Sequence, residues 1–246
     1  MSLATAAATV KDLLGLQAEP VAVFLLAGND LGPFGSWEPV RGHRYCQALM
    51  RARRGASVLL RPEELACPAA AAAFGMRPLP ENLANGKGLV GFGIVARPAT
   101  GRAMFEGMAR LAPGAVSALA LCPLAAAPRL PDVVVIEDEP ERLMWLLLAD
   151  LNLAGGARRS ASTAVLQATC VDATVIPHLE QRLNFSLGCY GCREATDLGS
   201  AEAVLGFPGA MLEPLCAELH ALGETAILRS RAKAAFEHLE RPERQP

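Results

Sequence analysis

Short apolar runs, bounded by glycine, proline or acidic residues, alternate along this chain with segments of helical periodicity, and this alternation most constrains the fold. Four of the runs have the length and composition of buried strands: VAVFLLAG (21–28), SVLLR (57–61), AVSALALCP (115–123) and PDVVVIED (131–138). Apolar side chains recur at helical spacing in three of the intervening segments, residues 4–16, 43–55 and 139–154. The alternation predicts an α/β domain, with a mixed α+β arrangement also open.

The chain length and charge limit the kind of protein this is. The 246 residues can bury a substantial core without disulfides, and we expect a single domain over 1–246, with a helical, charged tail at 223–246. With a net charge of -2, the composition offers no strongly basic surface of the kind that steers nucleic acids, so we expect no nucleic-acid partner. A homo-oligomer is compatible with this size, although no residue pattern argues for one.

No segment has the pattern of a signal peptide or a membrane span. The first apolar stretch is interrupted by Lys11 and Asp12. The most apolar later stretch, LMWLLLADLNLAGG (143–156), contains Asp150 and is shorter than the roughly 20 residues that a spanning helix needs. We therefore expect a cytoplasmic protein without membrane contact.

The seven cysteines are the residues of this chain that most clearly point to a chemical function. An odd number of cysteines in a reducing compartment argues against a disulfide framework. It favours roles for the cysteines in binding a metal or cofactor or as reactive thiols. Cys122 lies in an apolar strand and Cys216 on an apolar helix face, so we interpret both as small buried hydrophobic residues.

Four other cysteines stand at element boundaries or first turns. Cys46 lies near the start of the helix predicted at 43–55, and Cys67 precedes Pro68, which is favoured at the first position of a helix. Cys170 ends a predicted strand, TAVLQATC (163–170), and Cys189 lies on a glycine-rich turn. Four thiolates that converge from distant segments are what an iron-sulfur cluster or a structural zinc requires.

The stretch FSLGCYGCRE (185–194) contains the only pair of cysteines three residues apart. A thioredoxin-type CxxC opens a helix after a strand, whereas the glycines here favour a loop, and a zinc ribbon would need a second CxxC. We expect Cys189 to be a ligand, with Gly188 and Gly191 allowing backbone amides to approach and Arg193 supplying positive charge. Cys192 is then a spare thiol, a resolving thiol or an alternate ligand.

A weak internal repeat in the order of the predicted elements suggests two related halves with a βαβ-like order, roughly 1–112 and 113–222. Each half reads as strand, helix and strand, followed by a cysteine, which is Cys67 in the first half and Cys170 in the second. The cysteine cluster is expected at the junction of the halves.

Other familiar patterns are weaker. GKGLVG (86–91) has the spacing of a dinucleotide fingerprint, but it follows a loop and precedes a strand-like run, so we interpret it as a turn into a strand at 88–96. Arg51, Arg53 and Arg54 are expected on the solvated face of their helix. The segment from Ser200 onward is expected to be helical.

The histidines form no zinc-protease motif. His43 and His178 are each close enough to a predicted ligand in sequence to be an outer-shell neighbour or a substitute ligand. Either one alone is more often a surface or packing residue.

Five segments, in this order, resemble one known family: RYCQALMRAR, ACPAAAAAFGM, the isolated Cys170, SLGCYGCR and GFPGAMLEPLCAEL. The resemblance is to the uncharacterised proteins called domain of unknown function 169, also described as ArCR, and it covers roughly Val10 to Leu222. No activity is assigned to that family. The family's spaced cysteines and its C-x-G-x-R element map here to Cys46, Cys67, Cys170, Cys189, Gly191 and Arg193. Cys192 departs from the pattern.

Three functions remain open at this point. The first is a cytosolic protein with one 4Fe-4S cluster on Cys46, Cys67, Cys170 and Cys189, which exchanges electrons with a redox partner protein or a small-molecule substrate. In the second, the same cysteines hold a structural zinc. The third is a metal-free thiol enzyme with Cys189 as nucleophile and Cys192 as its resolving partner.

Overall fold

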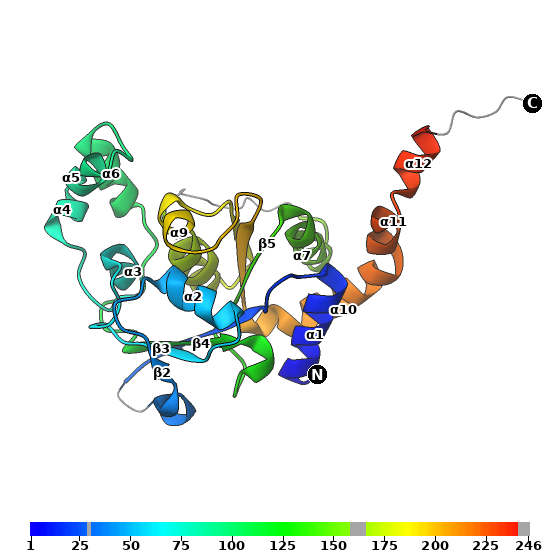
Figure 1. The fold of residues 1–246 in the computed structure, drawn as a ribbon, viewed down its shortest axis with the longest axis horizontal. Coiled ribbons are helices and arrows are strands. Elements are labelled where there is room, and N and C mark those ends of the chain that lie inside the picture. The colour runs from blue at the N-terminus through cyan, green and yellow to red at the C-terminus, as the bar shows by residue number, and fades with distance from the viewer. Residues whose placement is uncertain (29–30, 158–165, 241–246) are drawn as a thin grey trace, which may run out of the picture.

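The computed structural model describes residues 1–28, 31–157 and 166–240. Within them, a seven-stranded sheet with the order β2-β3-β4-β1-β5-β7-β6 forms the middle layer of the molecule (Figure 1). Neighbouring strands pair antiparallel, except that β2 and β3 are parallel. The strands are β1 (Val21–Leu26), β2 (Glu38–Pro39), β3 (Val58–Leu60), β4 (Ala118–Pro123), β5 (Val133–Asp138), β6 (Asn184–Ser186) and β7 (Ala203–Pro208).

Both faces of the sheet are buried, because alternate side chains of each central strand enter different cores. On β1, Val21 and Val23 contribute to one hydrophobic cluster while Ala22 and Phe24 contribute to the other. This explains why the central strands appear in the sequence as continuous apolar runs.

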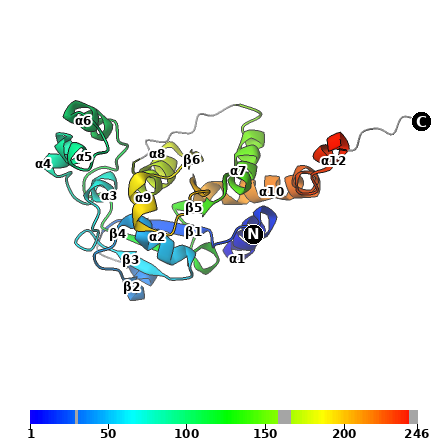
Figure 2. The same ribbon diagram turned by 45° about the horizontal axis from the view of Figure 1, so that its top comes forward.

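Helices cover the two faces (Figures 1 and 2). On one side, α1 (Leu3–Leu14) packs against both α7 (Pro140–Leu153) and α10 (Leu212–Leu222). On the other side lie α2 (Tyr45–Arg53), α3 (Pro68–Ala73) and the π-helix η3 (Ala168–Val175). The predicted α/β class is confirmed, as a three-layer arrangement around one mixed sheet.

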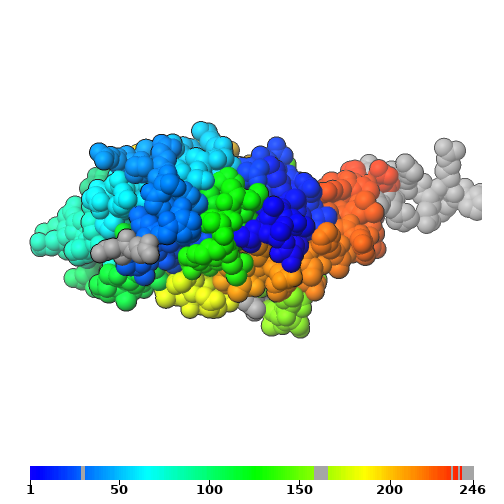
Figure 3. Space-filling model, turned by 90° about the horizontal axis from the view of Figure 1, so that it is seen from below, coloured from blue at the N-terminus to red at the C-terminus, as the bar shows by residue number. Residues whose placement is uncertain are grey.

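The remaining helical segments lie at the ends of this arrangement. A group of short helices, α4–α6, protrudes on the side of α3, and α11 and α12 extend away from the body at the opposite end (Figures 1 and 3). No helix among the described residues is long and apolar enough to span a bilayer. The segments are η1 (Gly32–Ser36), α4 (Glu81–Ala84), α5 (Lys87–Gly91), α6 (Pro98–Glu106), η2 (Leu124–Ala126), α8 (Ile176–Glu180), α9 (Tyr190–Ala195), η4 (Gly209–Met211), η5 (Gly223–Ile227), α11 (Leu228–Arg231) and α12 (Ala234–Glu240).

Three predicted elements are wrong. The strand expected at 88–96 is instead most of α5 and a turn, because a short apolar run does not distinguish a strand from a helical turn. The strand expected at 163–170 falls partly outside the described residues, and residues 168–170 begin the π-helix η3. The expected all-helical end contains β7, a six-residue strand that pairs with β5 along its whole length.

The two proposed halves interleave within the sheet. Strand β4 belongs to the second half, yet it lies between β1 and β3 of the first. An ancient duplication therefore stays a prediction, and the halves are not separate βαβ units in space.

One glycine explains how η3 approaches the sheet. A Cβ atom on Gly206 of β7 would lie 1.8 Å from the backbone oxygen of Ala173. No side chain fits there, so Gly206 lets the π-helix lie directly on the strand.

Candidate functional site

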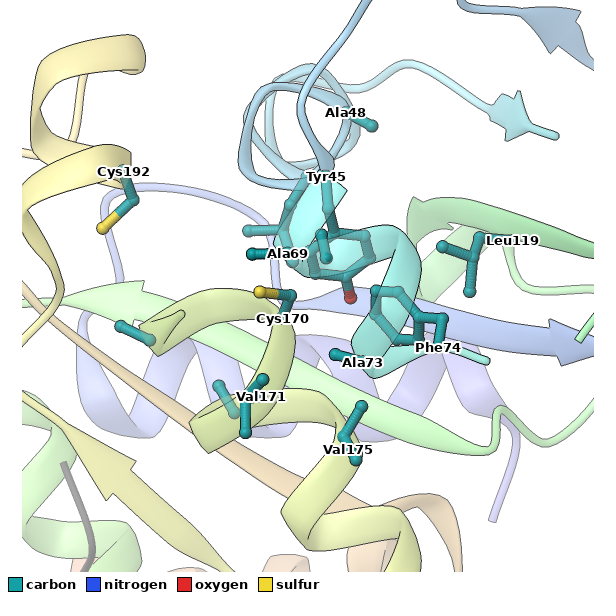
Figure 4. Close-up of a cluster of buried hydrophobic side chains, with 14 of the residues drawn as sticks. Tyr45, Ala48, Ala69, Ala73, Phe74, Leu119, Cys170, Val171, Val175 and Cys192 are labelled. Carbon is teal, nitrogen blue, oxygen red and sulfur yellow. The ribbon is translucent and has the colours of Figure 1, made fainter. Parts of the chain in front are cut away.

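Five cysteines line one cavity of about 280 Å³, beside α2, α3, η3 and the start of α9. That volume is roughly nine times a water molecule's share of the liquid, which suits a compact cluster or a small ligand. Figure 4 shows Cys170 of η3 close to Ala69 of α3 and to Tyr45 of α2, with Cys192 on α9. The five include all four of the cysteines predicted as ligands: Cys46, Cys67, Cys170, Cys189 and Cys192.

The first half of the chain supplies Cys46 and Cys67 from two adjacent helix starts. The amide of Ala66 donates to the carbonyl of His43 at 2.9 Å, which holds the segment before α3 against the segment before α2. Cys67 is the N-cap of α3, as predicted from Pro68. Both residues are half-buried, whereas Cys170, Cys189 and Cys192 are buried.

Cys170 arrives on the π-helix. Gln167, with a φ of 58°, adopts the left-handed conformation directly before η3, and Cys170 lies within its first turn. π-Helical turns are rare and occur frequently at functional sites. The prediction that a sheet strand delivers Cys170 is therefore corrected: a helix laid on the sheet places it beside the cavity.

The interpretation of the Cys189 and Cys192 segment as a loop is also wrong. Strand β6 ends at Ser186, and Cys189 is the N-cap of α9. The amide of Cys192 donates to the sulfur of Cys189 at 3.3 Å, and the amide of Cys189 donates to the sulfur of Cys192 at 3.0 Å. The glycines permit this strand-to-helix turn and do not prevent a helix start.

The two thiols of this pair have opposite acidities. A hydrogen bond from Cys192 is the main cause that lowers the pKa of Cys189 to about 6, against the effect of burial, and amides of Ala168, Cys192 and Gly191 add to it. The same hydrogen bond raises the pKa of Cys192, and burial raises it further. At neutral pH, Cys189 is therefore the thiolate of the pair.

Burial and mutual repulsion keep two other thiols protonated. Burial raises the pKa of Cys46 to about 12, with further rises from the neighbouring Cys189 and Cys67. Burial also raises the pKa of Cys170, with contributions from Cys67, Cys189 and Cys46. The thiols are thus close enough to oppose each other's ionisation, which a bound cation would reverse.

Arg193 holds the turn that presents Cys189. Its guanidinium donates to the carbonyls of Gly199 at 2.5 Å, Leu187 at 2.5 Å and Glu202 at 2.7 Å. Gly188, with a φ of 86°, lies against this guanidinium, where a Cβ would be 3.1 Å from its nitrogen. Arg193 therefore fixes the backbone on both sides of α9, and its role in balancing thiolate charge stays a prediction.

Gly191 also has a defined place in the site. Its carbonyl accepts a hydrogen bond from Arg44 at 3.2 Å, which connects α9 to the start of α2. A Cβ at Gly191 would lie no closer than 3.9 Å to any group outside its own helix, and its amide, in the first turn of α9, donates to the sulfur of Cys189.

Among the described residues, no three His, Cys, Asp or Glu side chains are arranged to hold a metal ion as they stand. The five cysteines share the lining of one cavity. His43 and His178, named as outer-shell or substitute ligands, do not line the cavity, and neither does any other described histidine. His43 instead contacts the carbonyl of Arg41 at 2.8 Å.

Two hydroxyl groups that sequence reasoning missed lie at the cavity wall. Tyr45 is buried, and its hydroxyl hydrogen-bonds to Thr174 of η3 at 2.8 Å. Thr169 is also buried and lines the cavity, and its hydroxyl has no partner among the described residues.

A buried ion network, also missed, lies on the same side of the sheet. Arg53 was expected to face solvent, yet its side chain is only 6% exposed and pairs with Glu137 of β5, Asp197 and Glu202. The one signal for it was an acidic residue, Glu137, that continues the apolar run of a buried strand.

The mouth of the site is apolar. Phe92 is 69% exposed, Leu187 55% and Tyr190 56%, and these residues border a second, more open cleft of about 830 Å³ that shares Cys189 with the cavity. Leu89 of the GKGLVG segment and Phe92, the residue directly after it, line the cavity, so this part of α5 contributes apolar wall and is not arranged as a turn that opens a long helix.

Comparisons with known proteins identify related chains. A family profile described as uncharacterised ArCR, domain of unknown function 169, matches residues 9–218. An uncharacterized protein of Methanocaldococcus jannaschii is 27% identical over 206 residues, which cover 83% of this chain and 88% of that protein. No solved structure matches. The chain belongs to the uncharacterised ArCR family, domain of unknown function 169.

Proposed function

We propose that this protein binds one 4Fe-4S cluster through Cys46, Cys67, Cys170 and Cys189 and uses it for electron transfer or for redox chemistry on a small molecule. The observation that supports the proposal is that these four cysteines, which are spread over 144 positions of the chain, line a single cavity. Buried thiols that suppress one another's ionisation are suited to a cationic group that takes up several thiolates at once.

The size of the cavity favours a cluster over zinc. Four thiolates on one zinc ion stand about 2.3 Å from a common point. The cysteines line a cavity of about 280 Å³, which has room for an iron-sulfur cluster, whose thiolates are distributed over several irons. A chain with a large core also has little need of a structural clamp.

Other features of the cavity suit a cluster. Amides of Ala168, Gly191 and Cys192 already donate to the sulfur of Cys189, and hydrogen bonds to ligand sulfurs are one of the means by which proteins tune cluster potentials. Cys192, beside Cys189, is positioned as a hydrogen-bond donor to that ligand or as its substitute.

The location and the partner remain part of the proposal. All seven cysteines are free, which fits the reducing cytoplasm. The apolar mouth at Phe92, Leu187 and Tyr190 is the surface at which a redox partner protein or a small substrate would reach Cys189. No nucleic-acid partner is proposed, and a homo-oligomer remains open.

Anaerobic purification with iron, sulfide and zinc analysis tests the proposal. We expect about four iron and four sulfide per chain, a brown colour, and an electron paramagnetic resonance signal after reduction. Serine in place of Cys46, Cys67, Cys170 or Cys189 should lower the iron content. Cys122→Ser and Cys216→Ser are matched controls, since both residues are buried outside the cavity, and they should retain iron. A colourless protein with stoichiometric zinc would contradict the proposal.

A second candidate is a metal-free dithiol, and the capping of α9 by Cys189 favours it. A thiolate at a helix start with a protonated cysteine three residues on is the arrangement of disulfide-exchanging enzymes. In this function, Cys189 attacks a substrate disulfide, and Cys192 displaces the mixed disulfide, so that two electrons and two protons pass to the substrate. Alkylation should then select Cys189, and the double variant Cys46→Ala, Cys67→Ala should react as the unmodified protein does.

A further inference from the structure

Glu137 is a buried carboxylate on the cysteine side of the sheet. Val133 and Val135 of β5 face the hydrophobic core that contains Cys170, Cys189 and Cys192. Glu137 lies two residues after Val135 on the same strand, so its side chain points to the same face of the sheet. Its side chain is only 1% exposed. A charge in such a position is costly unless it is paired.

The pairing of Glu137 is incomplete. The Nε atom of Arg53 lies 3.4 Å from one carboxylate oxygen, but neither oxygen accepts a hydrogen bond from the described residues. Arg53 also pairs with Asp197 and, at 3.7 Å, with Glu202, so one buried guanidinium faces three carboxylates. Arg54 also pairs with Asp197, but it lies at the exposed edge.

The groups that face Glu137 connect it to the cysteines. Burial raises the pKa of Glu137 to about 7, Arg53 lowers it, and Glu202, Asp197 and Cys189 raise it. Glu137 in turn raises the pKa values of Cys46 and Tyr45 across the same space. Its protonation is therefore balanced near neutral pH and responds to charge in the cavity.

We propose that Glu137 binds one proton when the cysteine site is reduced and releases it when the site is reoxidised. The proposal rests on the redox function proposed above. On reduction, one electron from a low-potential one-electron donor enters the site, and one proton from solvent binds the carboxylate, so the buried region gains no net charge. Reoxidation by an acceptor of higher potential reverses both transfers.

The test is the pH dependence of the midpoint potential of the loaded protein, measured by potentiometric titration with dithionite as reductant. Between about pH 5 and pH 9 we expect the potential of the unmodified protein to fall with pH, approaching 59 mV per pH unit where Glu137 titrates. In Glu137→Gln this slope should be lost. A pH-independent potential in the unmodified protein, or the same slope in Glu137→Gln, would overturn the proposal.

A second variant covers the case in which Glu137→Gln does not fold. Glu202→Gln removes one of the negative charges that raise the proton affinity of Glu137, so the sloping region should move to lower pH with the slope retained. Glu213→Gln, at an exposed position on α10, is the control and should leave the curve unchanged. An unmoved curve in Glu202→Gln would count against Glu137.

A measurement without the metal separates the two proposals. Infrared spectroscopy of the metal-free protein should show a buried protonated carboxyl band that disappears with rising pH and is missing in Glu137→Gln. If the band is present but the protein contains no iron, the proposed cluster is wrong, and the finding that Glu137 is a buried carboxyl that titrates is kept. If the protein binds iron but the band is absent, only the proposed role of Glu137 is wrong.

Discussion

The sulfurs of Cys189 and Cys192 each accept a hydrogen bond from the other residue's backbone amide, at 3.3 Å and 3.0 Å. The exchange is reciprocal, but the thiols are not equivalent, because the hydrogen bond between the two side chains lowers the pKa of Cys189 and raises that of Cys192. The pair therefore has one thiolate that faces the cavity and one thiol that supports it.

Removing this support should make Cys189 less acidic. In Cys192→Ala we expect the apparent pKa of Cys189 to rise from about 6, because the hydrogen bond from Cys192 is the main cause of its low value. The rate of alkylation of Cys189, followed by peptide mass spectrometry over a pH series on metal-free protein, measures this. Cys192→Ser keeps a donor and should show a smaller rise. Identical profiles for all three proteins would refute the assignment.

Glu137 should make folding stability depend on pH. Its pKa is about 7 in the folded protein against an ordinary value of 4.5, so the folded state binds the proton more tightly than the unfolded state. The free energy of unfolding should therefore be undiminished below about pH 4.5 and fall as pH rises to about 7, by on the order of 3 kcal/mol. Urea unfolding at a series of pH values should show this fall in the unmodified protein and lose it in Glu137→Gln. An equally steep fall in the variant would assign it to other groups.

Arg53 should matter far more than its neighbour Arg54. Arg53→Met leaves Glu137 buried without its cation, and breaking such a pair costs about 3–5 kcal/mol. Arg54 is 58% exposed, so Arg54→Ala should cost less than about 1 kcal/mol. Chemical denaturation at neutral pH compares them, and the loss in Arg53→Met should shrink at acidic pH as Glu137 becomes neutral. Equal effects of the two substitutions would contradict the burial of the pair.

Gly206→Ala should displace the π-helix. The new methyl group would lie 1.8 Å from the oxygen of Ala173, so η3 must move, and overpacking of this kind costs roughly 1–3 kcal/mol or more. Because η3 carries Cys170, we also expect reduced iron retention in this variant. Gly35→Ala, whose nearest contact would be at 3.9 Å, is the matched control. Full stability and full iron content in Gly206→Ala would show that the contact is not tight.

The sequence was a good guide where periodicity and caps are local. Pro68 located the start of α3 and hence Cys67, and the apolar runs located β1, β4 and β5. Reasoning failed where tertiary contacts decide the structure: the π-helix depends on the space above Gly206, and β7 becomes a strand because it pairs with β5. The turn before α9 was misjudged because glycine was taken as a helix breaker, although Arg193 holds the turn in place.

Some residues of the site could be predicted from the sequence, and others could not. Four boundary cysteines could be selected from the sequence because their neighbours mark element ends, and all four line the cavity. Arg53 and Glu137 could not be paired in advance, because one lies on a helix and the other on a strand 84 positions later. The packing of α2 on β1, β3 and β4, beside β5 in the sheet, brings them together.

Strand β4 lies between β1 and β3 in the sheet, so β1 and β3 cannot be joined until β4 has been synthesised. A ribosome releases Cys46 and Cys67 long before the rest of the sheet is synthesised, and 142 residues lie between Cys46 and Cys189. At ordinary speeds of synthesis this delay is on the order of ten seconds. Throughout that interval the early thiols remain without their later companions, so any inorganic group must be inserted after translation is nearly finished.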